Sequence, residues 1–141
     1  EHYNDPRNSF FNQVLERRKG IPVTLSILYI LVADRCGIRL DPIGVPSHFM
    51  IGCFEEGKPF FIDSFQRGLL RSPDEVFTLI RRSNLIPKVS DLAPTPVREV
   101  LCRCCRNLAQ NFTAARDFVN ARLFSSFVDD FEATYKQQVK P

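Results

Sequence analysis

The chain has 141 residues, 44% of them hydrophobic and 25% charged, which is enough for one globular domain with a real core. The net charge is only +3 and the basic residues are scattered, which argues against a nucleic-acid partner. No apolar run approaches the ~20 residues of a membrane-spanning helix, and five cysteines without a disulfide-like spacing favour a reducing compartment. We therefore predict a cytoplasmic protein with no membrane partner.

Two helices are expected at the start of the chain. Asn8 is a candidate N-cap for a first helix that ends at Gly20. Pro22 suits the first position of a second helix, which ends at Gly37. Because this second helix is apolar on nearly all sides, we expect it to be buried centrally.

The pattern then changes to short runs that are typical of β-strands. These runs cover residues 39–45, 49–54 and 60–63. Ser72 and Pro73 then predict the start of a third helix, since serine is a preferred N-cap and proline is favoured at the next position.

The rest of the chain is expected to be helical after a connector. Residues 84–96 carry three prolines, and residues 97–136 have a helical pattern with a break near Asn111. This order predicts an α+β fold in which the central buried helix packs on a small antiparallel sheet, with additional C-terminal helices. We divide the chain into a core of residues 1–90 and a C-terminal helical extension of residues 91–141 packed on the core.

The start of the second helix is where a cysteine hydrolase would keep its nucleophile. A thiol at a helix N-terminus has a lowered pKa, a histidine exchanges its proton, and a carboxylate orients the ring. His48 and Asp63 lie at the ends of two predicted neighbouring strands, where cross-strand residues are about 5 Å apart. The chain thus carries two members of a triad, but Pro22 has no nucleophilic group.

Four segments of the chain match a known family in order and spacing. They resemble the SirB-type branch of the transglutaminase-like superfamily, with one local departure, because SirB-type domains commonly have Asp-Pro-Phe where this chain has Asp63-Ser64-Phe65. The segments are Tyr3-Asn4-Asp5-Pro6-Arg7-Asn8-Ser9, residues 14–26, Pro46-Ser47-His48-Phe49 and Ile62-Asp63-Ser64-Phe65.

The resemblance implies a transglutaminase-like (papain-like) core. Active members carry Gly-x-Cys, with a glycine closing the same helix fifteen residues after the cysteine. Gly20 and Gly37 fit this frame, which puts Pro22 at the nucleophile position. His48 and Asp63 match the histidine and aspartate of the family. The resemblance also implies two contexts, namely bacterial proteins of regulatory repute and an F-box subunit of ubiquitin ligases.

No other side chain is well placed to replace the missing thiol. Ser26 shares the helical face of the nucleophile position but lies about 6 Å deeper along the axis, and Thr24 is rotated by about 200°. Cys36 lies about 21 Å along the helix. Cys53 is an odd number of residues from His48, so in a strand the two side chains face opposite sides.

These residues leave three functions open. We favour a pseudoenzyme that acts as a protein-interaction or regulatory module with a protein partner, in which His48 and Asp63 form a structural tie. The alternatives are a hydrolase-type enzyme of altered chemistry, which uses the same two residues, and a small-molecule sensor in the inherited cleft. We predict no cofactor and no metal, because Cys102, Cys104 and Cys105 have no nearby histidine or second cysteine pair to complete a zinc site.

Overall fold

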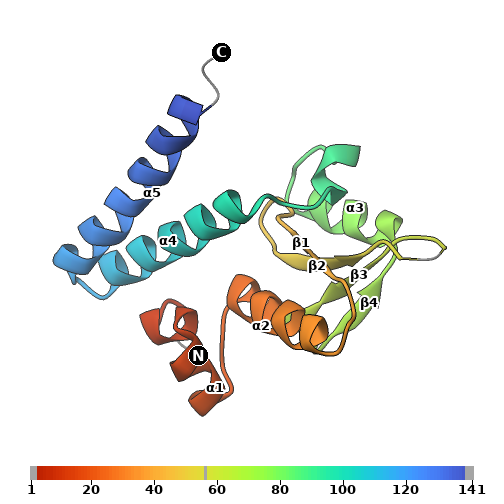
Figure 1. Cartoon of the computed structure of the whole chain (residues 1–141), viewed down its shortest axis with the longest axis horizontal. Helices are drawn as coiled ribbons and strands as arrows, with labels where there is room; N and C mark the ends of the chain where they lie inside the picture. The colour runs from red at the N-terminus through yellow and green to blue at the C-terminus, as the bar shows by residue number, and fades with distance from the viewer. Residues whose placement is uncertain (1–2, 56, 139–141) are drawn as a thin grey trace. The chain divides into compact units, whose positions relative to one another are not determined.

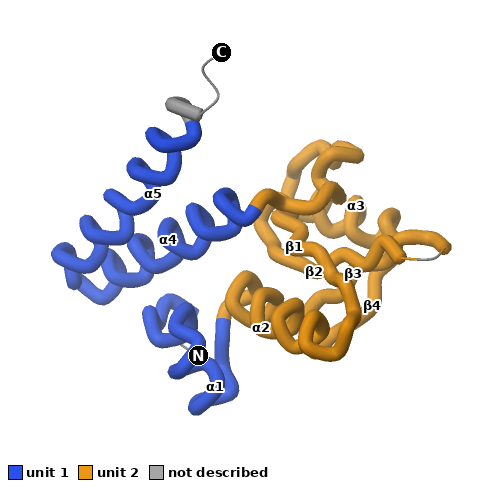
Figure 2. The backbone as a smooth tube through the Cα atoms, in the orientation of Figure 1, with its two compact units in different colours: residues 1–20, 97–141 blue, residues 21–96 orange. Residues whose placement is uncertain are grey.

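The computed structural model describes residues 3–55 and 57–138, with side chains described as far as residue 135. These residues form two compact units (Figure 2). Unit 1 combines residues 1–20 with residues 97–141, and unit 2 is continuous from residue 21 to residue 96. The units do not follow the predicted boundary at residue 90, since the N-terminal segment groups with the C-terminal helices. The division into a core and a packed extension therefore stays a prediction.

Unit 1 is helical. Helices α4 and α5 contact each other, and the rings of Phe112 and Phe124 stack between them with centroids 5.6 Å apart. The ring of Phe10 packs on Phe124 at 6.4 Å. The elements of the unit are the 3₁₀-helix η1 (Pro6–Ser9) and the helices α1 (Phe11–Arg17), α4 (Val97–Ala114) and α5 (Phe118–Gln138) (Figure 1).

The break between α4 and α5 lies after the predicted position. Asn111 is buried inside α4, and the chain turns only after Ala114. Arg116 adopts the left-handed conformation with φ 60°. Asp117 then accepts a hydrogen bond from the backbone N–H of Asn120 at 3.1 Å, as an N-cap residue does. The predicted break near Asn111 is therefore wrong by several residues.

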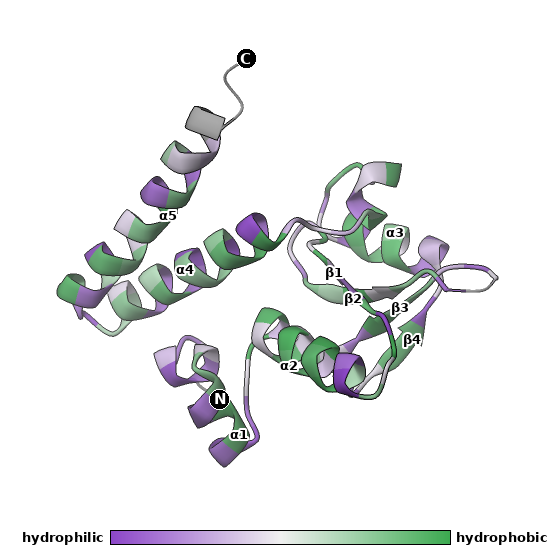
Figure 3. Cartoon of the chain, viewed as in Figure 1, coloured by the Kyte–Doolittle hydropathy of each residue, from purple (hydrophilic) through white to green (hydrophobic). Residues whose placement is uncertain are grey.

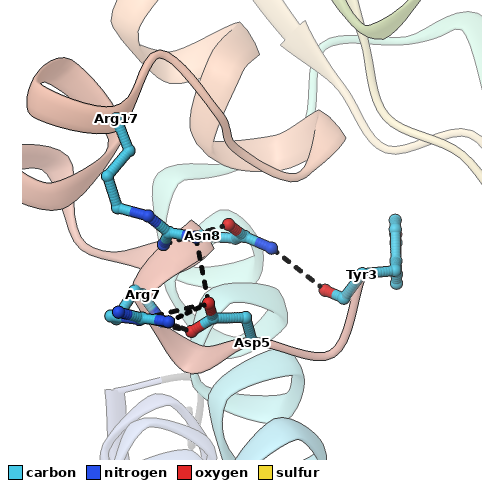
Figure 4. Close-up of polar contacts among 5 residues, drawn as sticks. All are labelled: Tyr3, Asp5, Arg7, Asn8 and Arg17. Carbon is cyan, nitrogen blue, oxygen red and sulfur yellow. Dashed lines mark hydrogen bonds and ion pairs between the residues drawn. The ribbon is translucent and has the colours of Figure 1, made fainter. Parts of the chain in front are cut away.

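A polar network closes the start of η1 (Figure 4). Asp5 is the N-cap residue and accepts a hydrogen bond from the backbone N–H of Arg7 at 3.0 Å. Its carboxylate also forms ion pairs with Arg7 at 2.9 Å and with Arg17 of α1 at 3.0 Å. Asp5 therefore joins η1 to α1.

Asn8 is part of the same network and is not the helix cap that the sequence predicts. Its side chain is buried, donates to the backbone oxygen of Tyr3 at 3.3 Å and accepts from Arg17 at 3.4 Å (Figure 4). Helix α1 instead begins at Phe11, and its N-cap Phe10 makes no side-chain capping bond. The amide of Asn8 is used for a tertiary contact, which sequence position alone does not reveal.

Replacing Asp5 by asparagine should lower the free energy of unfolding at neutral pH and make it less dependent on pH in acid. The side-chain hydrogen bond from Arg7 lowers the pKa of Asp5 from 3.8 to about 2; the backbone N–H of Arg7 and the charge of Arg17 add to it, and burial opposes it. A lowered folded-state pKa gives stability that is present above pH ~4 and is lost as the pH falls through ~2. Urea denaturation of both proteins between pH 5 and pH 2 checks this, and parallel pH curves would contradict it.

Unit 2 consists of an antiparallel sheet and the helices that pack against it. The strand order is β1-β2-β3-β4; α2 contacts β1 and β2, and α3 contacts β3 and β4 (Figure 1). The predicted α+β class is thus confirmed. The elements are α2 (Pro22–Arg35), β1 (Asp41–Ile43), β2 (Met50–Cys53), β3 (Phe60–Asp63), the 3₁₀-helix η2 (Ser64–Gln66), β4 (Leu69–Arg71), α3 (Pro73–Arg82) and the 3₁₀-helix η3 (Val89–Leu92).

One face of the sheet carries the core of unit 2. Because successive side chains in a strand alternate between faces, the strand register puts Ile43, Met50 and Phe61 on the same face. Val76 and Ile80 of α3 pack on this face, and all five side chains are at most 1% exposed. Apolar burial on this scale is the main source of stability for a small domain.

Helix α2 begins and ends where the sequence predicts. Pro22 is its first residue, and Gly37 follows its end with φ 73°, a conformation that glycine adopts without strain. Its first turn is buried, whereas part of its second half is not, although the helix is apolar along most of its length (Figure 3). The exposed apolar residues of α2 are Tyr29, Leu31 and Val32.

Helix α3 also starts as predicted. Ser72 accepts from the backbone N–H of Glu75 at 3.3 Å, and the carboxylate of Glu75 accepts from the backbone N–H of Ser72 at 2.7 Å. The pKa of Glu75 is lowered, chiefly because the backbone N–H of Ser72 donates to its carboxylate, and the Ser72 side chain adds to this effect. The next turns of α3 bring Val76 and Ile80 to the sheet.

Replacing Gly52 by alanine should destabilise unit 2 by about 1–3 kcal/mol. A Cβ atom at this position would lie 2.7 Å from the ring of Phe54 and 2.9 Å from Cδ1 of Ile43. Ile43 is fully buried and has little room to move. Thermal unfolding of the variant checks the effect, and an unchanged melting temperature would contradict it.

No helix in the part of the chain that the structure describes is both long enough and apolar enough to cross a membrane.

Candidate functional site

His48 and Asp63 lie together in unit 2. The Nε2 atom of His48 is 3.0 Å from Oδ1 of Asp63. Asp63 ends β3 as predicted, but His48 lies in the turn before β2 and not in the strand itself. The strand register explains their proximity: Ile51 pairs with Ile62, so the start of β2 lies beside the end of β3.

The turn before β2 holds His48 in a defined position. The backbone N–H of His48 donates to the oxygen of Val45 at 3.0 Å. Ser47 has φ 64°, in the left-handed region, which few residues other than glycine adopt without strain. Such strained residues persist where the surrounding structure requires them. The result is a histidine whose side chain is 22% exposed beside a carboxylate that is 2% exposed.

Asp63 is the centre of the polar network in this unit. Its Oδ1 atom also accepts the backbone N–H of Gln66 at 3.1 Å, which caps η2. Its Oδ2 atom accepts Nε of Arg71, from β4, at 3.3 Å. The buried carboxylate therefore has a permanent cationic partner in addition to His48, and a buried charge needs such a partner to be tolerated.

The start of α2 contains no nucleophile. Pro22 is its first residue and is buried, and the N-cap Ile21 makes no side-chain capping bond. Ser26 is fully buried, and its hydroxyl lies 2.9 Å from the hydroxyl of Ser64 in η2. Thr24 is only 3% exposed. Ser26 ties α2 to the segment that follows Asp63 and is closed to a substrate.

The two cysteines of unit 2 lie away from His48. Cys53 pairs with Phe60 in the sheet, three residues from Asp63 along β3 or about 10 Å at the rise of a strand. Cys36 is the C-cap residue of α2. Neither thiol can reach the imidazole without rearrangement of the sheet or the helix.

The sequence model of the transglutaminase-like superfamily matches residues 1–106 of this chain, about three quarters of its length. The chain belongs to this superfamily. The UPF0162 protein of Xylella fastidiosa (strain 9a5c) is 37% identical over 115 residues, which cover 77% of this chain and 41% of that protein. No solved structure matches the chain.

Two further relatives match shorter stretches. The UPF0162 protein of Vibrio cholerae serotype O1 (strain ATCC 39315 / El Tor Inaba N16961) is 39% identical over 66 residues, 46% of this chain and 24% of that protein. The mouse F-box only protein 21 is 38% identical over 63 residues, 45% of this chain and 10% of that protein. The chain thus spans less than half the length of each of these relatives.

The transglutaminase-like site of this chain can orient a histidine but offers it no thiol. A carboxylate that holds an imidazole is the second half of a triad, in which the first half is a nucleophile activated by the histidine. Here the charge of Asp63 is balanced by Arg71, and the imidazole is partly exposed. The arrangement can bind a polar group or hold the strands together.

The remaining cysteines, Cys102, Cys104 and Cys105, are in α4 of unit 1, and burial disfavours the thiolate form of two of them. Burial raises the pKa of Cys104 to about 11, with a smaller contribution from Cys105, and burial also raises the pKa of Cys105. Burial therefore makes both groups weaker nucleophiles than a cysteine in water. Among the described residues, no cluster of three histidine, cysteine or acidic side chains could hold a metal ion.

The sequence does not reveal Arg71 or the pair of Ser26 with Ser64 as parts of this site. Arg71 belongs to a strand that was not predicted, so nothing pointed to its contact with Asp63. Ser64 follows Asp63 directly and Ser26 shares the helical face of Pro22, which is the one signal that could have linked the two hydroxyls.

Proposed function

We propose that this chain is a non-catalytic domain of the SirB-type branch, which acts as a protein-interaction or regulatory module. The observation that carries the proposal is the buried Pro22 at the first position of α2, where an active relative would need a thiol. Proline is well suited to this position for helix formation, because its fixed φ and missing N–H cost nothing there. The position therefore serves the fold and leaves His48 without a nucleophile.

The network around Asp63 supports a structural role for the retained pair. A buried carboxylate that lost His48 would keep Arg71 and the N–H of Gln66, whereas loss of Asp63 would leave an arginine that is only 16% exposed without its partner. Removing one member of a buried ion pair costs about 3–5 kcal/mol. Stability alone is thus a sufficient physical reason to retain Asp63.

The distribution of relatives supports a modular role. In the mouse F-box only protein 21 the matched stretch is 10% of the protein, so a similar segment occurs within a much longer chain. A segment that occurs within longer proteins of different names is typical of a modular domain, and a module without a nucleophile would act by binding. The partner of this chain is proposed to be a protein.

A panel of peptide and amide substrates tests the proposal. We expect no turnover above a buffer control at any pH between 6 and 9, for the chain and for its His48→Ala variant alike. Turnover by the chain that disappears in His48→Ala would contradict the non-catalytic function.

An enzyme of altered chemistry is the second candidate, because 22% of the His48 side chain is exposed. A partly exposed imidazole held by a carboxylate can act as a general base toward water or a substrate hydroxyl. Under this alternative we expect hydrolysis whose pH profile is set by one ionising group and whose rate is unaffected by alkylation of the cysteines. The absence of any hydrolysis in the same panel removes it.

A further inference from the structure

Helix α5 packs on α4 through one of its faces (Figure 1). The ring of Phe124 stacks on Phe112 of α4. Ala121 and Val128 lie one turn to either side of Phe124, and each is 8% exposed. Because residues three and four apart are neighbours on the surface of a helix, these side chains form one buried face of α5.

A second apolar face of α5 is exposed. It is a stripe of three residues spaced four apart: Val119 is 81% exposed, Leu123 is 45% exposed and Phe127 is 39% exposed. At about 100° per residue, Leu123 is turned by about 160° from Ala121 and by about 140° from Val128, so the stripe points away from α4. A helix that is apolar on opposite sides is typically covered on both.

Opposite charges lie beside this stripe. Arg122 is turned by about 100° from Leu123, and Asp129 by about 120° in the same direction, so both are on one flank. Asp130 is in line with the stripe. All three charged side chains are exposed, and none forms an ion pair with another of the described residues. Arg122 and Asp129 are about 10 Å apart along the axis, which is too far for them to pair within one helix.

We propose that α5 packs antiparallel on α5 of a second copy of this chain, about a two-fold axis midway between residues 122 and 129. Arg122 then lies level with Asp129 of the second copy, and Asp130 is about 1.5 Å further along the axis. Leu123 and Phe127 of the second copy are likewise within about 1.5 Å of the same level. A two-fold axis of this kind brings the same flank of each helix to the same side of the interface, so the contact of Arg122 with Asp129 occurs twice.

The contact is self-complementary in apolar side chains and in charge. Burial of the two stripes favours association, and the two charge contacts favour the antiparallel register over others. Three apolar side chains from each copy form a smaller interface than that of a permanent dimer, so we expect the dimer to be reversible and concentration-dependent. The inference does not rest on the proposed function, because no step of it uses His48 or the missing thiol.

Sedimentation equilibrium of the chain tests the proposal. We expect a monomer–dimer equilibrium, and Leu123→Glu should raise the dimer dissociation constant at least about tenfold, because it buries a carboxylate beside Phe127 and near Asp130 of the second copy. Leu31→Glu is the matched control: Leu31 is 50% exposed on α2, and its replacement should leave the dissociation constant unchanged. Circular dichroism confirms that each variant is folded.

A mixture of two charge variants tests the register independently. Arg122→Glu, and separately Asp129→Lys combined with Asp130→Lys, should each form a weaker dimer, because like charges then lie level across the axis. An equimolar mixture of the two variants should restore the dissociation constant to within about threefold of the original chain, since both contacts of the mixed dimer join opposite charges. Three results would overturn the proposal: a monomer at all concentrations, a dimer that Leu123→Glu leaves intact, or a mixture that associates no more tightly than either variant alone.

Discussion

Replacing Asp63 by alanine will lower the free energy of unfolding by about 3–5 kcal/mol. The carboxylate is buried: its Oδ1 lies 3.0 Å from Nε2 of His48, and it accepts hydrogen bonds from Nε of Arg71 and the backbone N–H of Gln66. Its removal leaves the mostly buried guanidinium of Arg71 without its ion-pair partner and leaves η2 without its cap. Both losses act in the same direction.

Replacing His48 by alanine will cost less, about 1 kcal/mol. The imidazole is partly exposed, and Asp63 keeps Arg71 when it is removed. Urea denaturation of the two variants measures the difference, with Asp34→Ala as the control because Asp34 is an exposed carboxylate near the end of α2. A loss in Asp63→Ala no larger than in Asp34→Ala would contradict the structural role of the network.

Replacing Phe61 by alanine will lower the free energy of unfolding by about 3–5 kcal/mol. Phe61 is 1% exposed and lies in the central part of the core, edge-on to the ring of Phe54 with centroids 6.1 Å apart. Its loss removes the apolar contact with α3 and leaves a cavity that a sheet cannot easily close.

The neighbouring phenylalanine is a matched control for this substitution. Phe60 is the preceding residue of β3 and is 38% exposed. Phe60→Ala removes the same number of atoms from a partly exposed position, so we expect the free energy of unfolding to fall by only about 1 kcal/mol. Chemical denaturation with equal slopes for both variants makes the comparison valid. Similar losses of unfolding free energy in the two variants would show that the core does not lie on the face of the sheet that carries Phe61.

The helix boundaries in unit 2 were predictable because they depend on local chemistry. Pro22 fixes its own φ, Gly37 adopts a positive φ, and Ser72 with Glu75 forms a reciprocal cap. Each of these devices acts within four residues, so the sequence around it contains the whole signal.

Strand β4 was not predicted because it depends on a distant partner. Leu69 and Leu70 are both exposed, so the segment lacks the alternation of buried and exposed residues that marks a strand. It is a strand because its backbone pairs with β3. Because the pairing of β4 with β3 was not predicted, the contact of Arg71 with Asp63 was not predicted either.

The pairing of His48 with Asp63 was expected from two neighbouring strands, but the sequence did not reveal that part of the imidazole is exposed while the carboxylate is buried. The turn at Ser47 and the register of β2 with β3 decide which side chain is exposed. Asn8 gives the converse lesson: its amide was assigned to a helix cap and serves instead as a buried link between Tyr3 and Arg17. When a polar side chain has several possible hydrogen-bond partners, the tertiary structure determines which one it bonds.

The reactivity of each cysteine is the most direct test of a transglutaminase-like domain without a catalytic thiol. Alkylation by iodoacetamide, followed residue by residue with mass spectrometry between pH 5 and pH 9, measures which thiols ionise. We expect no cysteine to react faster at pH 6 than free cysteine, Cys104 to be among the slowest, and His48→Ala to leave every rate unchanged. A thiol that reacts rapidly at pH 6 and loses that reactivity in His48→Ala would contradict the account.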